Sequence, residues 1–148
     1  SPIFLAHSSI HERGIPEYEE IAIGAKSFEL EELKQINLYS WLIQTFSSLG
    51  IFEYVSMYYN KTYNLRYMQF FETFVEFCEN EKSIFSEEYE KVLKHIEKGY
   101  SGEGWNHYDE KLGDIFWPIE EASWLRLTYA KNTLKDDLER FLSYLEKK

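Results

Sequence analysis

Hydrophobic positions from about residue 29 onward recur with the three-to-four-residue period of α-helices. Between Glu29 and Gly50 this period predicts one long helix, with Gly50 as the residue that ends it. Ile36, Tyr39 and Ile43 give the same helix a second apolar side, and a helix that is apolar on two sides is usually central. The main stripe of this helix consists of Leu38, Trp41, Leu42, Thr45, Phe46 and Leu49.

The same periodicity predicts two further helices, over 51–60 and 65–80, with a turn over 60–64 between them. The first would face inward with Ile51, Tyr54, Val55, Tyr58 and Tyr59. The second would face inward with Tyr67, Phe70, Phe71, Phe74, Val75 and Cys78.

Two more helices are predicted in the C-terminal half. Ser86, followed by two glutamates, is the expected N-cap of the first of them. Pro118 is expected to open the second, which would run to the C-terminus, with Glu120 and Glu121 in the first turn, where the helix dipole favours carboxylates. The inward stripes are Tyr89, Val92, Leu93 and Ile96 in the first and Leu134, Leu138, Phe141 and Leu145 in the last.

Residues 1–28 have an extended pattern instead. Ile21 and Ile23 alternate within a predicted strand over 18–24, and residues 3–5 give a second short strand. Two strands are not stable alone in water, so they must lie on helices or complete a neighbouring sheet. The predicted fold is therefore mainly α, a bundle of about five helices over 29–148, with an extended or β segment over 1–28 that can complete an upstream domain.

Charge and cysteine content narrow the classes of partner and compartment. The 148 residues carry a net charge of −10, which repels phosphate backbones and anionic lipid surfaces, so we expect no nucleic acid and no membrane partner. Cys78 is the single cysteine, which excludes an internal disulfide or a cysteine metal cage and favours the cytoplasm. The chain begins without Met on an apolar stretch, so we expect it to be a segment of a longer polypeptide.

Aromatic residues make up 18% of the chain, with 12 Tyr and 11 Phe. This is more than one small core usually needs. Wide aromatic side chains can fill the space between long helices, or they can cover a partner surface or a pocket. We expect most of them in the core and a minority at a partner surface, which leaves a homodimer open.

The segment 99–114, GYSGEGWNHYDEKLGD, is the one long irregular stretch, and loops of this length are often functional. It has no phosphate-loop or dinucleotide pattern. We expect its mixed aromatic and polar side chains to contact a substrate. The candidate residues are Trp105, Asn106, His107, Tyr108 and Asp114 within this segment and Trp117 shortly after it.

Three features of the sequence could carry catalytic or metal-binding chemistry. His107 could act as a general acid–base, although a loop histidine satisfied by nearby acids is the more common case. His7, His11 and Glu12 have a spacing that could hold zinc only on a helix, and their context is not helical. Cys78 lies on an apolar face, where a thiol behaves as a small hydrophobe. The residues alone therefore predict no catalytic residue and no metal site.

Three stretches in order, IFLAHSSIHERGIPEYEEIAIGAKSF, SWLIQTFSSLGIFEYVSMYYNKTYNLRYMQFFETFVEF and GDIFWPIEEASWL, resemble the region after the radical SAM core in cobalamin-binding-type radical SAM proteins. The resemblance covers nearly the whole chain and is most specific over 113–125. It implies an upstream radical SAM domain in the same polypeptide. The iron–sulfur cluster, S-adenosylmethionine and cobalamin of such an enzyme would all be bound upstream.

The core of that family holds its cluster with a C-x-x-x-C-x-x-C motif, which this chain lacks. The resemblance therefore implies an accessory C-terminal helical domain that closes or positions substrate for the core, without catalysis of its own. One alternative is an independent, acidic and aromatic-rich interaction module. A small stand-alone enzyme that uses carboxylates and His107 ranks third.

Overall fold

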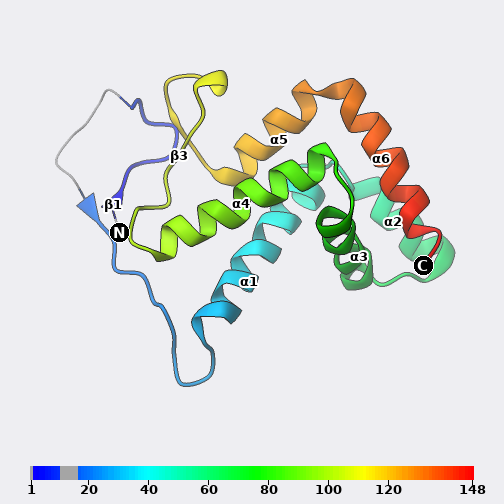
Figure 1. Cartoon of the computed structure of the whole chain (residues 1–148), viewed down its shortest axis with the longest axis horizontal. Coiled ribbons are helices and arrows are strands. Elements are labelled where there is room, and N and C mark those ends of the chain that lie inside the picture. Colours follow the sequence, from blue (N-terminus) through cyan, green and yellow to red (C-terminus); the bar gives the residue numbers. More distant parts are fainter. Residues whose placement is uncertain (1, 11–16) are drawn as a thin grey trace.

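The computed structural model describes residues 2–10 and 17–148. Within this part the chain is mainly α, a bundle of six α-helices with two small strand pairs at one end (Figure 1). The helices are α1 (Leu30–Leu42), α2 (Glu53–Tyr63), α3 (Tyr67–Asn80), α4 (Ile84–Tyr100), α5 (Ile119–Tyr129) and α6 (Lys131–Leu145). The strands are β1 (Pro2–Ile3), β2 (Glu17–Tyr18), β3 (His107–Tyr108) and β4 (Phe116–Trp117).

Helix α4, not α1, holds the central position. It contacts α1, α3, α5 and α6 and runs through the middle of the molecule (Figure 1). The predicted central place of α1 is wrong because its second apolar side has no covering helix: Ile36 is 59% exposed and Ile43 is 51% exposed. The main stripe is confirmed for Leu38, Trp41 and Leu42, which are buried, but it is wrong for Leu49, which is exposed after the end of the helical stretch.

Phenylalanines fill the core, while tyrosines occupy much of the surface. The ring of Phe52 alone lies within 4.8–5.7 Å, between centroids, of five other phenylalanine rings. By contrast, Tyr54 is 77% exposed and Tyr58 55% exposed, so their predicted inward orientation is wrong, and Tyr67 and Leu93 are also exposed. The buried phenylalanines of the core are Phe46, Phe52, Phe70, Phe71, Phe74, Phe77, Phe85 and Phe141.

Two of the predicted helix boundaries shift. Ser83, not Ser86, caps α4: Ser83 Oγ accepts from the Ser86 backbone N–H at 3.1 Å, and Ser86 Oγ accepts from the Ser83 N–H at 2.8 Å. This reciprocal pair is a capping box, which Ser at the third helical position can close in place of Glu. Helix α2 extends through most of the predicted turn and ends at Asn64, whose φ of 55° is left-handed.

The predicted helix over 29–50 is continuous but changes its winding. A π-helical segment, η1 (Ile43–Ser48), follows α1 directly and places Thr45 and Phe46 in the core. Gly50 follows it with a φ of 91°, which agrees with its predicted role in ending the helix.

The predicted last helix is two helices. Ala130, with φ −84° and ψ 42°, breaks it, and α6 folds back along α3 and α4. No proline or glycine marks this break, so the sequence carried no local signal for it. The predicted inward residues of this region are confirmed, because Phe141 and Leu145 are buried and Leu134 and Leu138 pack against the core.

The two N-terminal strands pair with each other, antiparallel, with Pro2 opposite Tyr18 and Ile3 opposite Glu17. The predicted strand over 18–24 is wrong beyond Tyr18, because residues 19–24 form no ladder with any described residue. These residues run extended and mostly exposed from the strand pair towards α1 (Figure 1). No helix in the described ranges is long and apolar enough to cross a membrane.

Candidate functional site: the glycine-rich loop and its ionic anchor

Two segments about a hundred residues apart form one small β assembly at the end of the bundle where the N-terminus lies (Figure 1). The backbone N–H of His7 donates to the carbonyl of Phe116 at 2.6 Å, and the N–H of Phe116 donates to the carbonyl of Ser8 at 3.0 Å. The rings of Phe4 and Phe116 stack at 5.0 Å. In the same assembly β3 pairs antiparallel with β4, so that His107 lies opposite Trp117.

Asn106 ties the loop to the N-terminal segment. Its Oδ1 accepts from the backbone N–H of Phe4, and its Nδ2 donates to the carbonyl of Phe4, both at 2.9 Å. The side-chain amide of Asn106 thus makes the two hydrogen bonds to Phe4 that the backbone of a neighbouring strand would make. Because both ends of the side chain are used, Asn106 contacts the fold itself, whereas the sequence suggested a substrate contact.

Trp105 fixes the loop to the C-terminal end of α4. Its ring lies over Gly99 so closely that a β-carbon there would approach it to 2.6 Å. Ring contacts to Tyr100, at 5.1 Å, and to His95, at 5.8 Å, complete the packing. Position 99 therefore needs glycine, and Trp105 acts as an apolar anchor of the loop.

A largely buried ionic network lies beneath the loop. Arg126 on α5 donates from Nε and Nη2 to the Glu88 carboxylate on α4, at 2.8 Å and 2.7 Å. Its Nη1 donates to Asp109 at 3.0 Å and to His107 Nε2 at 2.9 Å. Bidentate charge-assisted bonds of this type are the strong ones. Burial by itself lowers the pKa of Arg126. The carboxylates of Glu88 and Asp109 together have the larger effect, so the pKa of Arg126 is raised.

His107 is held neutral by this arrangement. Arginine can only donate, so Nε2 of His107 must be the acceptor and its proton lies on Nδ1. Burial, and then the positive charge of Arg126, lower its pKa to about 4, although Asp109 and Glu88 oppose the shift. The neighbouring His95, 5.8 Å away between ring centroids, also has a pKa lowered to about 4, mainly by burial.

A general acid–base needs a pKa near the working pH and a free lone pair. His107 has neither, because its pKa lies well below neutrality and Arg126 occupies its Nε2. The arrangement favours the interpretation of His107 as a loop histidine satisfied by its neighbours. The expected partners of His107 were nearby acids. Instead Arg126 contacts the His107 ring directly, and the carboxylates of Asp109 and Glu88 bind Arg126.

The other candidate residues lie on the outer side of the same hairpin. Tyr108 is exposed, and its hydroxyl lies 3.4 Å from Asp114. Trp117 is half-buried with its ring edge on His7, at 5.4 Å, and its indole N–H is buried without a partner in the described residues. The structure thus brings all six predicted site residues to one end of the bundle. Tyr108 and Asp114 are the ones that a ligand could reach directly.

Of the three residues whose spacing was weighed for zinc and rejected, His11 and Glu12 lie outside the described residues. His7 has a left-handed φ of 62°, and its Nε2 lies 2.8 Å from the Glu121 carboxylate. Residues 2–10 and 17–148 contain no group of three or more side chains that could hold a metal ion. Glu121, in the first turn of α5, thus also contacts the His7 ring.

Sequence reasoning missed Arg126 and Glu88, which hold the site together. One signal was present: Glu88 lies between Phe85 and Val92 on the apolar stripe of α4, where an unpaired charge is costly. A charge inside an apolar stripe implies a buried partner. The identity of that partner depends on the packing of α5 against α4, which no local pattern specifies.

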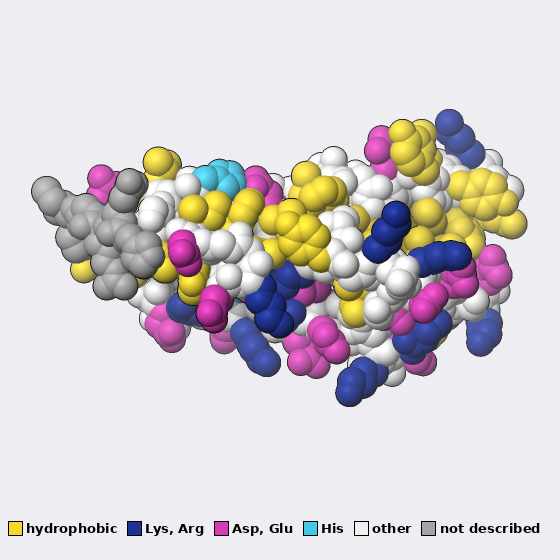
Figure 2. All heavy atoms as spheres, turned by 90° about the horizontal axis from the view of Figure 1, so that it is seen from above, with side chains coloured by type: hydrophobic (Ala, Val, Ile, Leu, Met, Phe, Trp, Pro, Cys, Tyr) yellow, Lys and Arg dark blue, Asp and Glu magenta, His cyan; other side chains and the backbone are white. Residues whose placement is uncertain are grey.

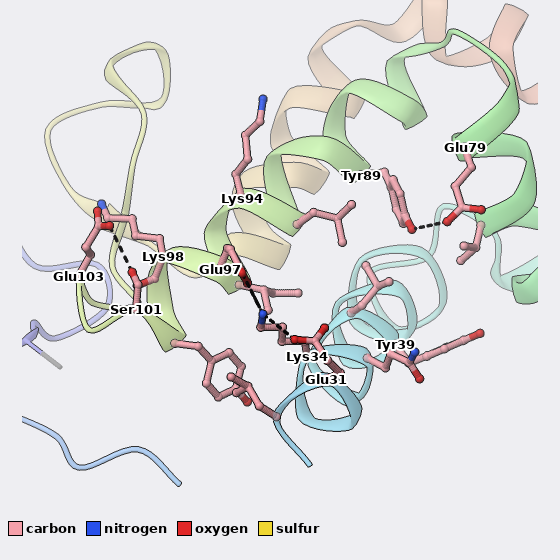
Figure 3. A pocket seen from close by; sticks show the side chains of 17 residues that line it. Glu31, Lys34, Tyr39, Glu79, Tyr89, Lys94, Glu97, Lys98, Ser101 and Glu103 are labelled. Carbon is pink, nitrogen blue, oxygen red and sulfur yellow. Dashed lines mark hydrogen bonds and ion pairs between the residues drawn. The ribbon is translucent and has the colours of Figure 1, made fainter. Parts of the chain in front are cut away.

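A second feature is an open groove of about 1130 Å³ between α1 and α4 (Figure 3). Its floor is apolar, and its rim carries both signs of charge. Lys34 bridges Glu31 and Glu97 at 2.9 and 2.6 Å across the groove, and Glu79 accepts from the Tyr89 hydroxyl at 2.9 Å. The apolar lining consists of Leu30, Leu38, Val75, Leu93 and Ile96.

Comparisons with protein-family models, with curated proteins and with solved structures found no match for this chain.

Proposed function

We propose that this chain is an accessory helical domain of a radical SAM enzyme of the cobalamin-binding type. The observation that carries the proposal is the meeting of the most specific stretch of the resemblance with another of its stretches. Residues 4–9 and 113–117 are far apart in the sequence, yet they share backbone hydrogen bonds and a stacked pair of phenylalanine rings. A sequence motif split between two such segments is expected when the pair builds one functional surface.

The catalytic machinery in this proposal belongs to the upstream core. A radical SAM cluster is held by three cysteine thiolates, and this chain has one cysteine. Cys78 is buried among core side chains, and burial raises its pKa well above that of a free thiol. The residues present therefore do not fit an iron–sulfur cluster, and no step is assigned to one here. Cobalamin and S-adenosylmethionine are likewise assigned to the core.

The role of the domain would be to cover or position a substrate. Enzymes that form reactive intermediates need water and side reactions kept away, which a packed domain at the mouth of the core can achieve. The loop end suits this role because Arg126, Asn106 and Trp105 fix its backbone while Tyr108 and Asp114 remain accessible. A surface held in this way binds with little loss of conformational entropy.

The test uses the full-length parent enzyme with Tyr108→Ala and Asp114→Ala. Both side chains are exposed, so the melting temperature should stay unchanged while turnover falls or the substrate KM rises. Tyr129→Ala is the control, because Tyr129 is an exposed tyrosine at the end of α5, outside the loop. If turnover and KM stay unchanged in both loop variants, as they do in the control, a substrate-facing role is contradicted. Trp105→Ala and His107→Ala test the support of the loop in the same assay.

One observation favours a second candidate, an independent interaction module. Tyr54, Tyr58 and Tyr63 are all exposed on α2, and Figure 2 shows hydrophobic side chains gathered along one face of the molecule. Tyrosine is enriched in protein interfaces. In a pull-down, this candidate predicts a specific protein that is retained by the wild type and lost from the triple Tyr→Ser variant. Equal retention by both chains would contradict it.

A further inference from the structure

We propose that the groove between α1 and α4 is the docking site for an amphipathic α-helix of another protein, one that carries carboxylates along one of its flanks. This inference does not depend on the proposed function, because it rests on the groove alone. None of the residues Trp105, Tyr108 and Asp114, on which that function depends, lines the groove.

The apolar surface of α1 continues past the edge of the groove. Tyr39 lines the groove, and Ile36 and Ile43 lie three residues before it and four residues after it, so all three share one side of the helix. Both isoleucines are more than half exposed. Single exposed apolar residues are ordinary on a protein surface, but an exposed apolar stripe beside an apolar groove is typical of a binding surface.

The walls of the groove determine which secondary structure can bind there. Both walls are α-helices, whose backbone N–H and C=O groups bond within the helix, so the groove has no strand edge for an extended peptide. Over the apolar floor, an extended peptide would leave some of its own backbone groups without partners. An α-helix brings its backbone hydrogen bonds with it, which favours a helix as the occupant.

The groove is open along its length, so any occupant keeps one face in water (Figure 3). A wholly apolar ligand, such as an acyl chain, would remain partly exposed there. An amphipathic helix instead places its apolar face on the floor and its polar face in the solvent. The open shape therefore favours an amphipathic helix over a lipid.

The length of the groove corresponds to about three helical turns. Its wall on α4 runs from Tyr89 to Tyr100, a rise of about 17 Å at 1.5 Å per residue. Lys34, whose side chain is 20% exposed, crosses the floor between Glu31 and Glu97. The bound helix therefore needs a small or polar residue over this ionic bridge, and leucine-sized residues elsewhere on its apolar face.

The α4 wall determines the charge of the partner. Lys94 and Lys98 lie one turn apart, and neither has a carboxylate within 4.0 Å among the residues that the structure describes. In Figure 3 Lys94 extends from the rim into the open. The carboxylates that line the groove all have a hydrogen-bond partner within the chain, and they are Glu31, Glu79, Glu97 and Glu103. The unpaired charge on the rim is positive, which favours carboxylates four residues apart on the facing flank of the bound helix.

The experiment uses three synthetic peptides of about 18 residues, a length that allows partial helix formation in water. The glutamate peptide has leucines on one face with an alanine at the centre, two glutamates four residues apart on one flank, and glutamines elsewhere. The lysine peptide has lysines in place of the glutamates. The proline peptide is the glutamate peptide with a proline at its centre, which breaks the helix.

Fluorescence anisotropy of the labelled peptides, at about 0.15 M salt to screen the net charge of the chain, gives each Kd. We expect the glutamate peptide to bind, the lysine peptide to bind about tenfold more weakly, and the proline peptide not to bind. Equal affinity for the lysine or the proline peptide would overturn the proposal, because the groove would then select neither acids nor a helix. The absence of binding by the glutamate peptide at millimolar concentration would overturn it as well.

Charge reversal then locates the binding site. Lys94→Glu with Lys98→Glu should reverse the preference between the glutamate and lysine peptides. Lys131→Glu with Lys135→Glu, at two exposed lysines four residues apart on α6, is the matched control and should keep the wild-type preference. An unchanged preference in the Lys94 and Lys98 variant would contradict binding in the groove.

The apolar side of α1 is tested by Ile36→Ser, a change at an exposed position that should leave the melting temperature unchanged. It should weaken the glutamate and the lysine peptide by the same factor, because it removes apolar contact and no charge. Sedimentation velocity of the chain alone should give a monomer. A dimer that Ile36→Ser dissociates would show that a second copy covers the groove, and would contradict a helix of another protein as its occupant.

Discussion

The two ends of this molecule are held together by different physical means. At the α2–α3–α6 end, phenylalanine rings from four segments pack around Phe52 in a buried apolar core. At the loop end, Arg126 joins α4, α5 and the β3–β4 hairpin through charges and hydrogen bonds. Apolar packing distributes its stabilisation over many contacts. The ionic anchor depends on one residue, but it fixes the backbone of the loop in a defined geometry.

This difference between the two ends indicates which of them can carry a functional site. A site needs side chains in fixed positions that are still reachable, which a phenylalanine core does not provide. The loop end provides both, since Arg126 and Asn106 are committed to holding it while Tyr108 and Asp114 face outward. The predictions below separate the two means of stabilisation.

The largest effect is expected in the apolar core. Phe52→Ala removes a fully buried ring that contacts five others, and such changes cost about 3–5 kcal/mol of unfolding free energy. Urea unfolding followed by circular dichroism measures it. Tyr54→Ala, at an exposed aromatic residue in the first turn of α2, is the control and should change stability by less than about 0.5 kcal/mol. Similar losses in the two variants would refute the assignment of phenylalanines to the core and tyrosines to the surface.

Arg126→Met should cost somewhat less, about 3 kcal/mol, because it removes the bidentate partner of the buried Glu88 carboxylate and leaves it only the ion pair with Lys91. Adding Glu88→Gln to the same chain removes this poorly compensated buried charge and should recover part of the loss. The same urea titrations give the coupling between the two positions. A double variant as unstable as the sum of the single ones would show that the two residues are not coupled.

The pH dependence should come from the loop end. His95 and His107 have folded-state pKa values of about 4, below the value of 6.5 that an unfolded chain retains. Between these values the unfolded state binds protons that the folded state does not, so stability is fully present above about pH 6.5 and is lost as the pH falls towards 4.

The measurement is the unfolding free energy of wild type and of His95→Gln with His107→Gln across this range. The double variant should have a smaller slope. An equal slope in wild type and double variant would show that the two rings are not held neutral.

The smallest effect is expected at Asn106. Asn106→Ala removes both hydrogen bonds to Phe4 and should cost about 1–2 kcal/mol, concentrated in the N-terminal segment. Hydrogen exchange at the Phe4 and His7 amides should accelerate, while the amides of α3 should exchange at the wild-type rate. Faster exchange throughout the chain would mean that the two ends are not independent.

Periodicity explains why much of the bundle was predictable. Phe70, Phe74 and Phe141 lie on stripes that only a helix places on one face, and they are buried. The same pattern failed for Ile36 and Tyr58, because an apolar stripe states which side could be buried but not whether another helix covers it. The break at Ala130 likewise depends on how α6 packs on α3, and no local residue encodes it.

The candidate site was half predictable for a similar reason. Glycine content located the loop, and its six candidate residues do lie together. The bonds that fix it, from Asn106 to Phe4 and from Arg126 to Glu88, join residues 102 and 38 positions apart. Such pairs are set by tertiary packing, which a single sequence does not display.

The accessory-domain proposal is tested most directly by the size of the native polypeptide, measured by blotting extracts of the source cells with an antibody raised against this chain. The account predicts a band several domains larger, whose upstream part carries three cluster cysteines. A band near 17.8 kDa, the mass of these 148 residues, would contradict it and favour the independent interaction module.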